Sequence, residues 1–176
     1  IESMITMIQS LIERGHAYIA DDQDVYFDRQ SFQNDGQLAH QKLETLYTEV
    51  RKALSSAKRQ GLDFILWKQA KPGEPSWPSP WGLGRPGWHI ECSAMATQLL
   101  GHSIDLHGGG IDLKFPHHEN EIAQSEGATG HPFVKYWIHV GHVLVNEEKM
   151  SKSLGNFTSV RDLLVQYHPE VIRYLL

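Results

Sequence analysis

The chain has 176 residues, of which 40% are hydrophobic, and a formal net charge of −5 at pH 7. These values are typical of a soluble globular protein with one domain, or with one domain and part of another, and they argue against a disordered chain. No apolar run approaches the about 20 residues of a membrane helix, and the acidic balance argues against nucleic-acid binding over the whole surface. A single cysteine excludes an internal disulfide framework and indicates a reducing compartment.

The start of the chain predicts a helix followed by a hairpin. Apolar side chains recur at helical spacing over residues 1–14, and Gly15 is a natural stop for that helix. Two short strand-like runs at 18–20 and 25–27 flank an acidic tetrapeptide. Runs of this kind around a short polar connection predict a β-hairpin.

The middle of the chain has a polar loop at 31–37, helical spacing over 40–59, and then an abrupt change of composition. Five prolines and four glycines are interspersed over 71–87. Such a segment predicts an ordered loop or a linker, because it cannot form a regular helix or a central strand. Trp77 and Trp81 favour the ordered loop, since a flexible linker rarely carries two indoles.

The second half predicts alternating helices and strands. The expected elements are a helix over 89–100, a strand over 103–107, a glycine turn at 108–110, a helix from Pro116 to about 126 ended by Gly127, and strands over 136–140 and 142–145. A polar loop is expected at 147–156. Ser159 and Asp162 resemble a capping box that opens a helix to about residue 167, and a last helix starts near Pro169.

Histidines gather in one part of the chain, where eight of the 11 fall between residues 89 and 142. On a helix, His117 and Glu121 lie one turn apart on the same face, so both side chains can aim at one point. With Cys92 they form three competent zinc ligands, and zinc usually takes four. The fourth ligand would be another histidine, a residue outside this sequence, or a substrate. The alternative is a buried packing cysteine beside a solvated helix face.

Two further stretches could bind a nucleotide. Glycines at 108–110 precede Asp112; glycine lets a backbone approach a ligand closely, and a carboxylate can accept hydrogen bonds from ribose hydroxyls. A tight turn is the alternative there. The pentapeptide KMSKS at 149–153 offers two lysines and two hydroxyls that could surround a polyphosphate, with a solvated basic loop as the alternative.

Several long motifs together resemble one family. KMSKS is the nucleotide-loop motif of class I aminoacyl-tRNA synthetases. Within that class, GRPGWHIECSAM at 84–95 and HGGGIDLKFPHHENE at 107–121 resemble signatures of the cysteinyl members. So does DFILWK at 63–68. The chain is therefore similar to cysteinyl-tRNA synthetases, most densely from about residue 62 onward.

The resemblance implies a role for each matching residue. The implied zinc ligands are Cys92, His117 and Glu121, with the remaining ligand a cysteine near the family's N-terminus, outside this sequence. The residues implied at the cysteine pocket are Trp88, which would help to close it, and His89, His107 and His118. The residues implied at ATP are Gly109, Asp112, Lys149, Ser151, Lys152 and Ser153.

The resemblance also implies an ATP-dependent cysteine–tRNA ligase. The carboxylate of L-cysteine would attack the α-phosphorus of ATP, with Mg²⁺ accompanying the nucleotide, and the cysteinyl group would then pass to tRNA(Cys). Zinc would select the thiolate, because a pocket built on shape alone separates cysteine from serine poorly. Lys149 and Lys152 would be the catalytic residues, since they would support the leaving pyrophosphate.

The implied fold is α/β: the second half of a Rossmann-like catalytic domain with part of an inserted domain. The boundaries predicted are 1–75 for the end of the inserted domain, 76–157 for the catalytic half with the KMSKS loop, and 158–176 for the start of a helical stem-contact region. The helix and hairpin over 1–27 look like the family's inserted domain. Nothing is carried over to residues 40–60, which depart from the family pattern.

The chain opens at Ile1 without an initiator methionine and without a signal-peptide pattern. We therefore expect a piece of a longer polypeptide that is cytoplasmic, not membrane-bound, and monomeric. The HIGH-type motif, which the class uses with KMSKS to hold ATP, does not occur in this sequence. The 176 residues alone are accordingly expected to be inactive.

Three other functions fit parts of the pattern. A ligase that joins cysteine to an amino sugar in mycothiol synthesis would share the adenylation core and the zinc site, and a shared core does not fix the acceptor. A non-catalytic zinc-binding or nucleotide-binding module is a second alternative. A zinc hydrolase is weakened, because no H-E-x-x-H is present and no general base stands out.

Overall fold

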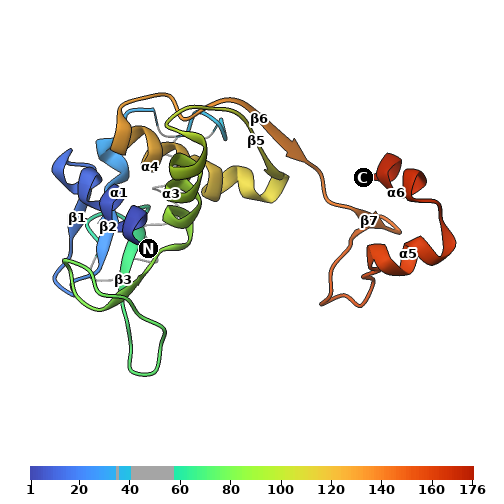
Figure 1. Cartoon of the computed structure of the whole chain (residues 1–176), viewed down its shortest axis with the longest axis horizontal. Coiled ribbons are helices and arrows are strands. Elements are labelled where there is room, and N and C mark those ends of the chain that lie inside the picture. The colour runs from blue at the N-terminus through green and yellow to red at the C-terminus, as the bar shows by residue number, and fades with distance from the viewer. Residues whose placement is uncertain (35, 41–57) are drawn as a thin grey trace.

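The computed structural model describes residues 1–34, 36–40 and 58–176. The helix predicted over 40–59 lies almost wholly outside these residues and stays a prediction. Figure 1 shows a main body that contains the elements up to β6, and an arm after β6 that carries β7, α5 and α6. Helices occur together with antiparallel and parallel strands, which agrees with the predicted α/β class.

The first helix and the hairpin form as predicted. Gly15 follows helix α1 (Glu2–Glu13) with a φ of 79°, a conformation that favours glycine. Strands β1 (Ala17–Ile19) and β2 (Val25–Phe27) pair antiparallel. Helix α1 presents an apolar stripe to the core, formed by Met4, Met7, Ile8 and Leu11.

Two strands that the apolar pattern did not predict extend the hairpin into a four-stranded sheet, in the order β1-β2-β3-β4. β3 (Phe64–Gln69) pairs antiparallel with β2, and β4 (Gly84–Pro86) pairs antiparallel with β3. β4 is the edge strand, a position that tolerates proline. The segment 71–87 is thus an ordered connection, as its two tryptophans indicated, and Trp81 is buried near Trp67.

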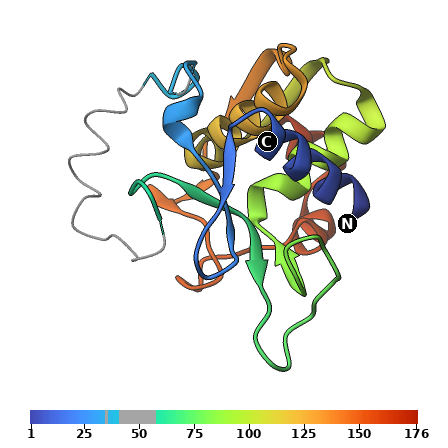
Figure 2. The ribbon, with the colours of Figure 1, turned by 90° about the vertical axis from the view of Figure 1, so that its left-hand side faces the viewer.

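A second layer consists of two helices and two parallel strands. α3 (Trp88–Leu100) follows β4, and β5 (Ile104–Gly110) pairs in parallel with β6 (Val134–Val140). α4 (Glu119–Thr129) forms the crossover that parallel strands require, and it packs against α3 and α1. Figure 2 shows the three helices beside the four-stranded sheet.

Two predictions about glycine are wrong. The glycines at 108–110 do not turn the chain, because they are the last residues of β5 and pair with 138–140 of β6. Gly127 does not end the helix either: it lies inside α4, where a Cβ would stand 3.1 Å from the side chain of Leu11. The helix stops at Gly130, which has the left-handed φ of 75°. In both places packing, rather than chain reversal, requires the glycine.

The chain between β5 and α4 is irregular. A 3-10 turn (Ile111–Leu113) leads into a single π-helical turn (Lys114–His118). The regular helix begins at Glu119, three residues after the start predicted at Pro116. His117 therefore lies in the turn before α4 rather than on the helix itself.

The main hydrophobic core lies between α1, strands β1–β3, α3 and α4. Its fully buried side chains include Ile8, Leu11, Phe27, Leu66, Trp67 and Ile90. Helix α4 also buries a set of polar side chains, namely Glu119, Asn120, Glu121, Gln124 and Ser125. Burying polar groups costs free energy unless they find partners, so this helix is the natural place to look for a functional site.

The arm is short of buried side chains. β7 (Leu144–Val145) and β8 (Glu148–Lys149) form a small hairpin, followed by α5 (Val160–Gln166) and α6 (Pro169–Leu175). β7 is shorter than the predicted strand, and β8 lies within the predicted loop. Between residues 141 and 176, all of which the structure describes, only Ile172 is buried.

The predicted capping box at the start of α5 is present. The Ser159 side chain accepts a hydrogen bond from the Asp162 amide, and the Asp162 carboxylate accepts one from the Ser159 amide. None of the helices in the described ranges has the length and hydrophobicity needed to span a membrane.

Candidate functional site

The three side chains predicted as zinc ligands come together. Cys92 lies on α3, His117 in the turn before α4, and Glu121 in the first turn of α4. Their potential ligand atoms all lie within 4.8 Å of one another. His117 Nε2 is 2.9 Å from Glu121 Oε1, so the predicted one-turn spacing holds even though the histidine precedes the regular helix. A thiol, an imidazole and a carboxylate therefore converge on one point.

The carboxylate of Glu121 is the strongest sign that a cation fits here. It is 1% exposed, and its Oε1 makes no hydrogen bond among the described residues although His117 Nε2 is close. Its other oxygen, Oε2, accepts a hydrogen bond from His107 Nε2 at 2.8 Å. A buried carboxylate oxygen without a hydrogen bond is costly, and a metal ion shared with His117 would satisfy it. The set of sulfur, nitrogen and oxygen donors suits zinc.

A second histidine controls the ring of His117. His89 Nδ1 and His117 Nδ1 are 2.7 Å apart, so one ring donates to the other. Burial, followed by the neighbouring charges of His117 and Arg29, lowers the pKa of His89 to about 4. Burial likewise lowers the pKa of His117. When Nδ1–H of His117 is the donor and Nδ1 of His89 the acceptor, Nε2 of the neutral His117 ring is left available as a ligand, the usual arrangement around a metal-binding histidine.

Trp88 covers this histidine pair. Its ring centroid lies 4.6 Å from that of His117 and 5.1 Å from that of His89, while the indole itself is 61% exposed. The tryptophan thus has one face on the rings of His89 and His117 and remains accessible from outside. This position suits a side chain that closes over a small ligand.

The surroundings of Cys92 favour its protonated thiol form. Burial raises the pKa of its Sγ, and the negative charges of Glu121 and Glu91 raise it further. A metal ion binds the thiolate, so binding would release a proton from this residue.

A second group of side chains also has metal-binding potential. The ligand atoms of His107, His118 and Glu121 lie within 4.8 Å of one another. His107, however, already donates to Glu121, and Nδ1 of His118 lies 2.8 Å from Nε2 of His139. Because this group also lacks a sulfur ligand, we interpret it as the support of the first group.

Trp137 and His139 are site residues that the sequence did not identify. Both lie on β6, two residues apart and therefore on the same face of the strand. The indole of Trp137 lies 4.6 Å from the ring of His107 and 4.9 Å from that of His118, measured between centroids. Their period-two spacing was the available signal, but only the pairing of β6 with β5 brings them to the site.

The glycine strand forms a wall of the site. A Cβ on Gly109 would lie 2.8 Å from Cε1 of His118, so only glycine lets β5 pass this ring. Asp112 follows the strand, and its Oδ2 lies 3.9 Å from Nζ of Lys149 in the KMSKS sequence. One residue predicted at the ribose and one predicted at the phosphates thus lie close together after the end of β5.

The KMSKS loop is a turn closed by its own polar groups. The Ser151 amide donates to Asn156 Oδ1 at 2.8 Å, and the Asn156 side chain donates to the carbonyl of Lys149 at 3.2 Å. Asn156 was not among the predicted site residues. Ser151 Oγ and Ser153 Oγ lie 3.1 Å apart, and Nζ of Lys152 lies 5.6 Å from the ring centroid of Phe157. We call the candidate ligands Cys92, His117 and Glu121 the metal-binding group. Within the described ranges, no hydrogen bond joins the KMSKS loop to this group.

The family model for the catalytic domain of class I (C) tRNA synthetases matches residues 1–176. The chain belongs to this family. Over all 176 residues this synthetase chain is 61% identical to a cysteine–tRNA ligase of Alkalilimnicola ehrlichii, and 60% identical to those of Legionella pneumophila (strain Paris) and Methylococcus capsulatus. It spans 38%, 39% and 38% of the length of these relatives, respectively. The resemblance read from the motifs is confirmed, and the comparisons do not favour the amino-sugar ligase or a non-catalytic module.

Proposed function

We propose that the polypeptide carrying this sequence is an ATP-dependent cysteine–tRNA ligase whose zinc site selects the thiol of L-cysteine. The observation that carries the proposal is the convergence of Cys92, His117 and Glu121, with one buried carboxylate oxygen left without a hydrogen bond. Relatives about 60% identical to the chain bear the name of this activity.

Zinc would be held by Cys92, His117 and Glu121, together with a cysteine ligand from outside this sequence. When bound, zinc supplies a preference for thiolate over hydroxyl, which a pocket of fixed shape cannot provide against serine. His107 holds the carboxylate of Glu121 from the other side, and His89 holds the ring of His117. These contacts orient the ligands before any ion arrives.

The amino acid itself would lie under Trp88. The exposed face of this indole would close over the substrate, and His89, His107 and His118 would line the pocket beneath. The reduced pKa of His89 and His118, each about 4, keeps these rings neutral at neutral pH. Neutral rings can donate hydrogen bonds to a bound thiolate but do not attract it by charge. The choice between cysteine and serine would therefore depend on coordination to the metal.

ATP would bind where β5 ends. Asp112 would accept hydrogen bonds from the ribose hydroxyls, and Gly109 would leave room for the nucleotide beside the strand. Lys149, Ser151, Lys152 and Ser153 would contact the phosphates, with Mg²⁺ bound to the nucleotide. Attack of the cysteine carboxylate on the α-phosphorus needs no side-chain nucleophile. The two lysines would therefore act by neutralising the pyrophosphate as it leaves.

The domain organisation follows from the same proposal. Residues 1–75 would end an inserted domain, 76–157 would form the second half of a Rossmann-like domain, and 158–176 would begin a helical region toward the tRNA. β4 reaches across the first boundary, since it completes the sheet of β1–β3. Leu106, Tyr136, Ile138 and Val140 of the parallel pair are 51–67% exposed, which supports further strands or helices packing against β5 and β6. We propose a monomeric cytoplasmic enzyme.

The test is cysteine-dependent exchange of pyrophosphate into ATP by the complete polypeptide. We expect exchange with cysteine but not with serine, loss of exchange on removal of zinc with a chelator, and cysteinylation of tRNA(Cys). The 176-residue chain alone should not catalyse exchange. Transfer of cysteine to an amino sugar instead of tRNA, or equal exchange with serine, would contradict the proposal.

A further inference from the structure

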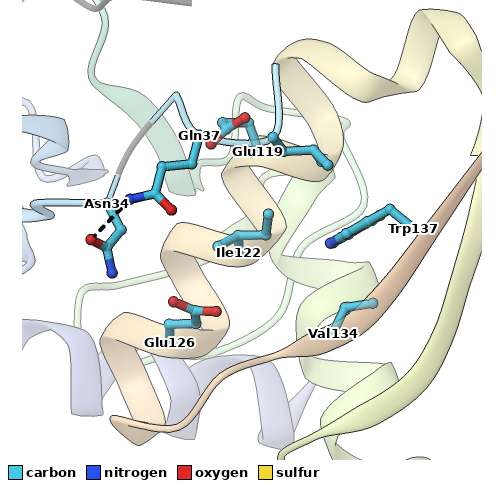
Figure 3. Close-up of a pocket in the computed structure, with 8 residues that line it drawn as sticks. Asn34, Gln37, Glu119, Ile122, Glu126, Val134 and Trp137 are labelled. Carbon is cyan, nitrogen blue, oxygen red and sulfur yellow. Dashed lines mark hydrogen bonds between the residues drawn. The ribbon is translucent and has the colours of Figure 1, made fainter. Parts of the chain in front are cut away.

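Glu119 is a buried carboxylate that the proposed zinc site does not use. It begins α4, two residues after His117 and two before Glu121, and it is 1% exposed. Each residue of an α-helix turns by about 100°, so Glu119 and Glu121 leave the helix about 200° apart. The carboxylate of Glu119 therefore points away from the metal ligands, toward the segment 36–39 (Figure 3).

Both oxygens of this carboxylate bind backbone amides of that segment. The N–H of Gly36 donates to Oε1 at 2.8 Å, and the N–H of Ala39 donates to Oε2 at 2.9 Å. A buried charge is retained only where such partners compensate it, and hydrogen bonds to a charged acceptor are about twice as strong as neutral ones. Glu119 thus ties the segment 36–39 firmly to the first turn of α4.

The backbone at the start of α4 is irregular, while the side chains of His117 and Glu121 are held by His89 and His107. The cap position, His118, makes no side-chain hydrogen bond to the helix, and the preceding turn is π-helical with Phe115 in an extended conformation. The first amides of a helix have few partners within the helix, and here the N–H of Glu119 donates to the carbonyl of Pro116 across the irregular entry. Glu121 lies in this first turn and His117 in the turn before it. Contacts that hold Glu119 in place therefore contribute, beside His89 and His107, to the direction of both ligands.

A cavity of about 270 Å³ lies beside Glu119 and reaches Trp137. It lies between α4, β6 and the segment that Glu119 holds, and Figure 3 shows Gln37 beside Glu119 at one end and Trp137 across from Ile122. Trp137 packs on His107, which in turn donates to Glu121. Segment 36–39 therefore lies on one side of the cavity, and Trp137, with the ring of His107 that it contacts, lies on the other.

We propose that Glu119 is a positioning residue for the metal centre. Its two hydrogen bonds to Gly36 and Ala39 fix the first turn of α4, and thereby the direction in which His117 and Glu121 present their ligand atoms. The inference rests on the proposed zinc site and adds to it a residue that touches neither the metal nor the substrate.

The test compares Glu119→Gln with Glu126→Gln in the complete polypeptide. Glu126 is a matched control, because it lies on the same helix, lines the same cavity, and also accepts a backbone N–H, that of Phe133 at 3.0 Å. Zinc affinity is measured by competition with a chromophoric chelator, the ligand geometry by the visible spectrum of the Co²⁺-substituted protein, and folding by thermal denaturation. Loss of an outer partner of a metal site weakens metal binding about 10- to 100-fold.

We expect Glu119→Gln to lower zinc affinity at least about 10-fold and to alter the cobalt spectrum, with Glu126→Gln close to the unmodified protein. Unchanged zinc affinity and an unchanged spectrum in folded Glu119→Gln would overturn the inference. If that variant does not fold, Glu119→Asp decides, because it keeps the charge and withdraws it by one methylene. Weakened zinc binding by folded Glu119→Asp supports the inference; normal binding, or failure of both variants to fold, overturns it.

An unmodified polypeptide that binds no zinc would give a different result. It would refute the zinc site, and with it the proposed function, whatever the variants do. Normal zinc binding by the unmodified protein and by both Glu119 variants would refute only the positioning role.

Discussion

The metal-binding group and the KMSKS loop differ in how their side chains are held. In the group, Glu121 is 1% and His117 4% exposed, and each has a polar partner from another element of the main body. In the loop, the side chain of Lys149 is 53% exposed and its ion-pair partner Asp112 is 3.9 Å away. A surface pair of this kind contributes about 0–1 kcal/mol.

The difference reflects what each region is proposed to bind. Metal ligands discriminate by geometry, so they are oriented by packing and by hydrogen bonds before the ion arrives. Lysines bind phosphate as flexible point charges, so their arrangement can form around the ligand. A site that selects a substrate is thus built in advance, while a loop that assists a leaving group is free to close on it.

The largest effect is expected from Cys92→Ser. A structural zinc ion binds with about 10–16 kcal/mol shared among four ligands, so loss of one ligand costs about 2.5–4 kcal/mol, or roughly 60- to 700-fold in affinity. Zinc content by mass spectrometry and cysteine-dependent exchange should both be lost. Full zinc occupancy in this variant would show that Cys92 is a packing residue, and the contrast between the two regions would lose its basis.

The loop should respond in the opposite way. Lys152→Ala removes a charge that would stabilise the leaving pyrophosphate, and we expect exchange to slow about 100-fold, the usual cost of losing one such donor. Zinc content and melting temperature should stay unchanged. Lys135→Ala is the control, because this exposed lysine pairs with Asp105 on the surface. A loss of zinc from Lys152→Ala would show that metal binding depends on the KMSKS loop, and it would contradict the separation of the two regions.

A smaller effect tests the wall of the site. In Gly109→Ala the new Cβ would lie 2.8 Å from His118 and 3.1 Å from Leu113, and such overpacking costs about 1–3 kcal/mol. In Gly108→Ala the nearest atom is the carbonyl oxygen of Ile138 at 3.5 Å, an ordinary contact. Urea unfolding should separate the two neighbours by at least about 1 kcal/mol. Equal stability would mean that β5 does not press on His118.

The smallest effect belongs to the arm. Ser159→Ala removes the capping side chain of α5, which costs the helix about 1 kcal/mol. Because the arm buries little, faster amide exchange should be confined to residues 160–166, with zinc affinity and exchange of the main body unchanged. Protection lost from α4 as well would show that the arm and the metal centre unfold together.

The sequence predicted the chemistry of the site better than its construction. Cys92, His117 and Glu121 were identified from their chemistry and spacing, because one helical turn brings the last two together. Trp137 and His139 were not, since only the parallel pairing of β5 with β6 carries them to the site. Long-range pairing of this kind leaves little trace in local periodicity.

Two local errors both arise where burial departs from the usual pattern. The apolar run of β3 alternates little, because Leu66 and Trp67 are both buried, and it therefore lacks the period of a half-exposed strand. Helix α4 has the opposite problem: its residues look like a solvated face, yet Glu119 and Gln124 are buried. Their side chains find polar partners inside the protein, Gln124 at Ser93 and Glu119 at Gly36, which a pattern of single residues does not predict.

The tie between Glu119 and Gly36 also bears on the order of folding. The two residues are 83 positions apart, so their contact closes a long loop, and loops of this length are slow and entropically costly to close. During synthesis Gly36 emerges well before α4, with strands β3 and β4 and helix α3 between them, so this contact can form only late in synthesis. Zinc uptake by the growing or refolding protein should therefore mark one of the last steps of folding, and it offers a kinetic signal for completion of the native structure.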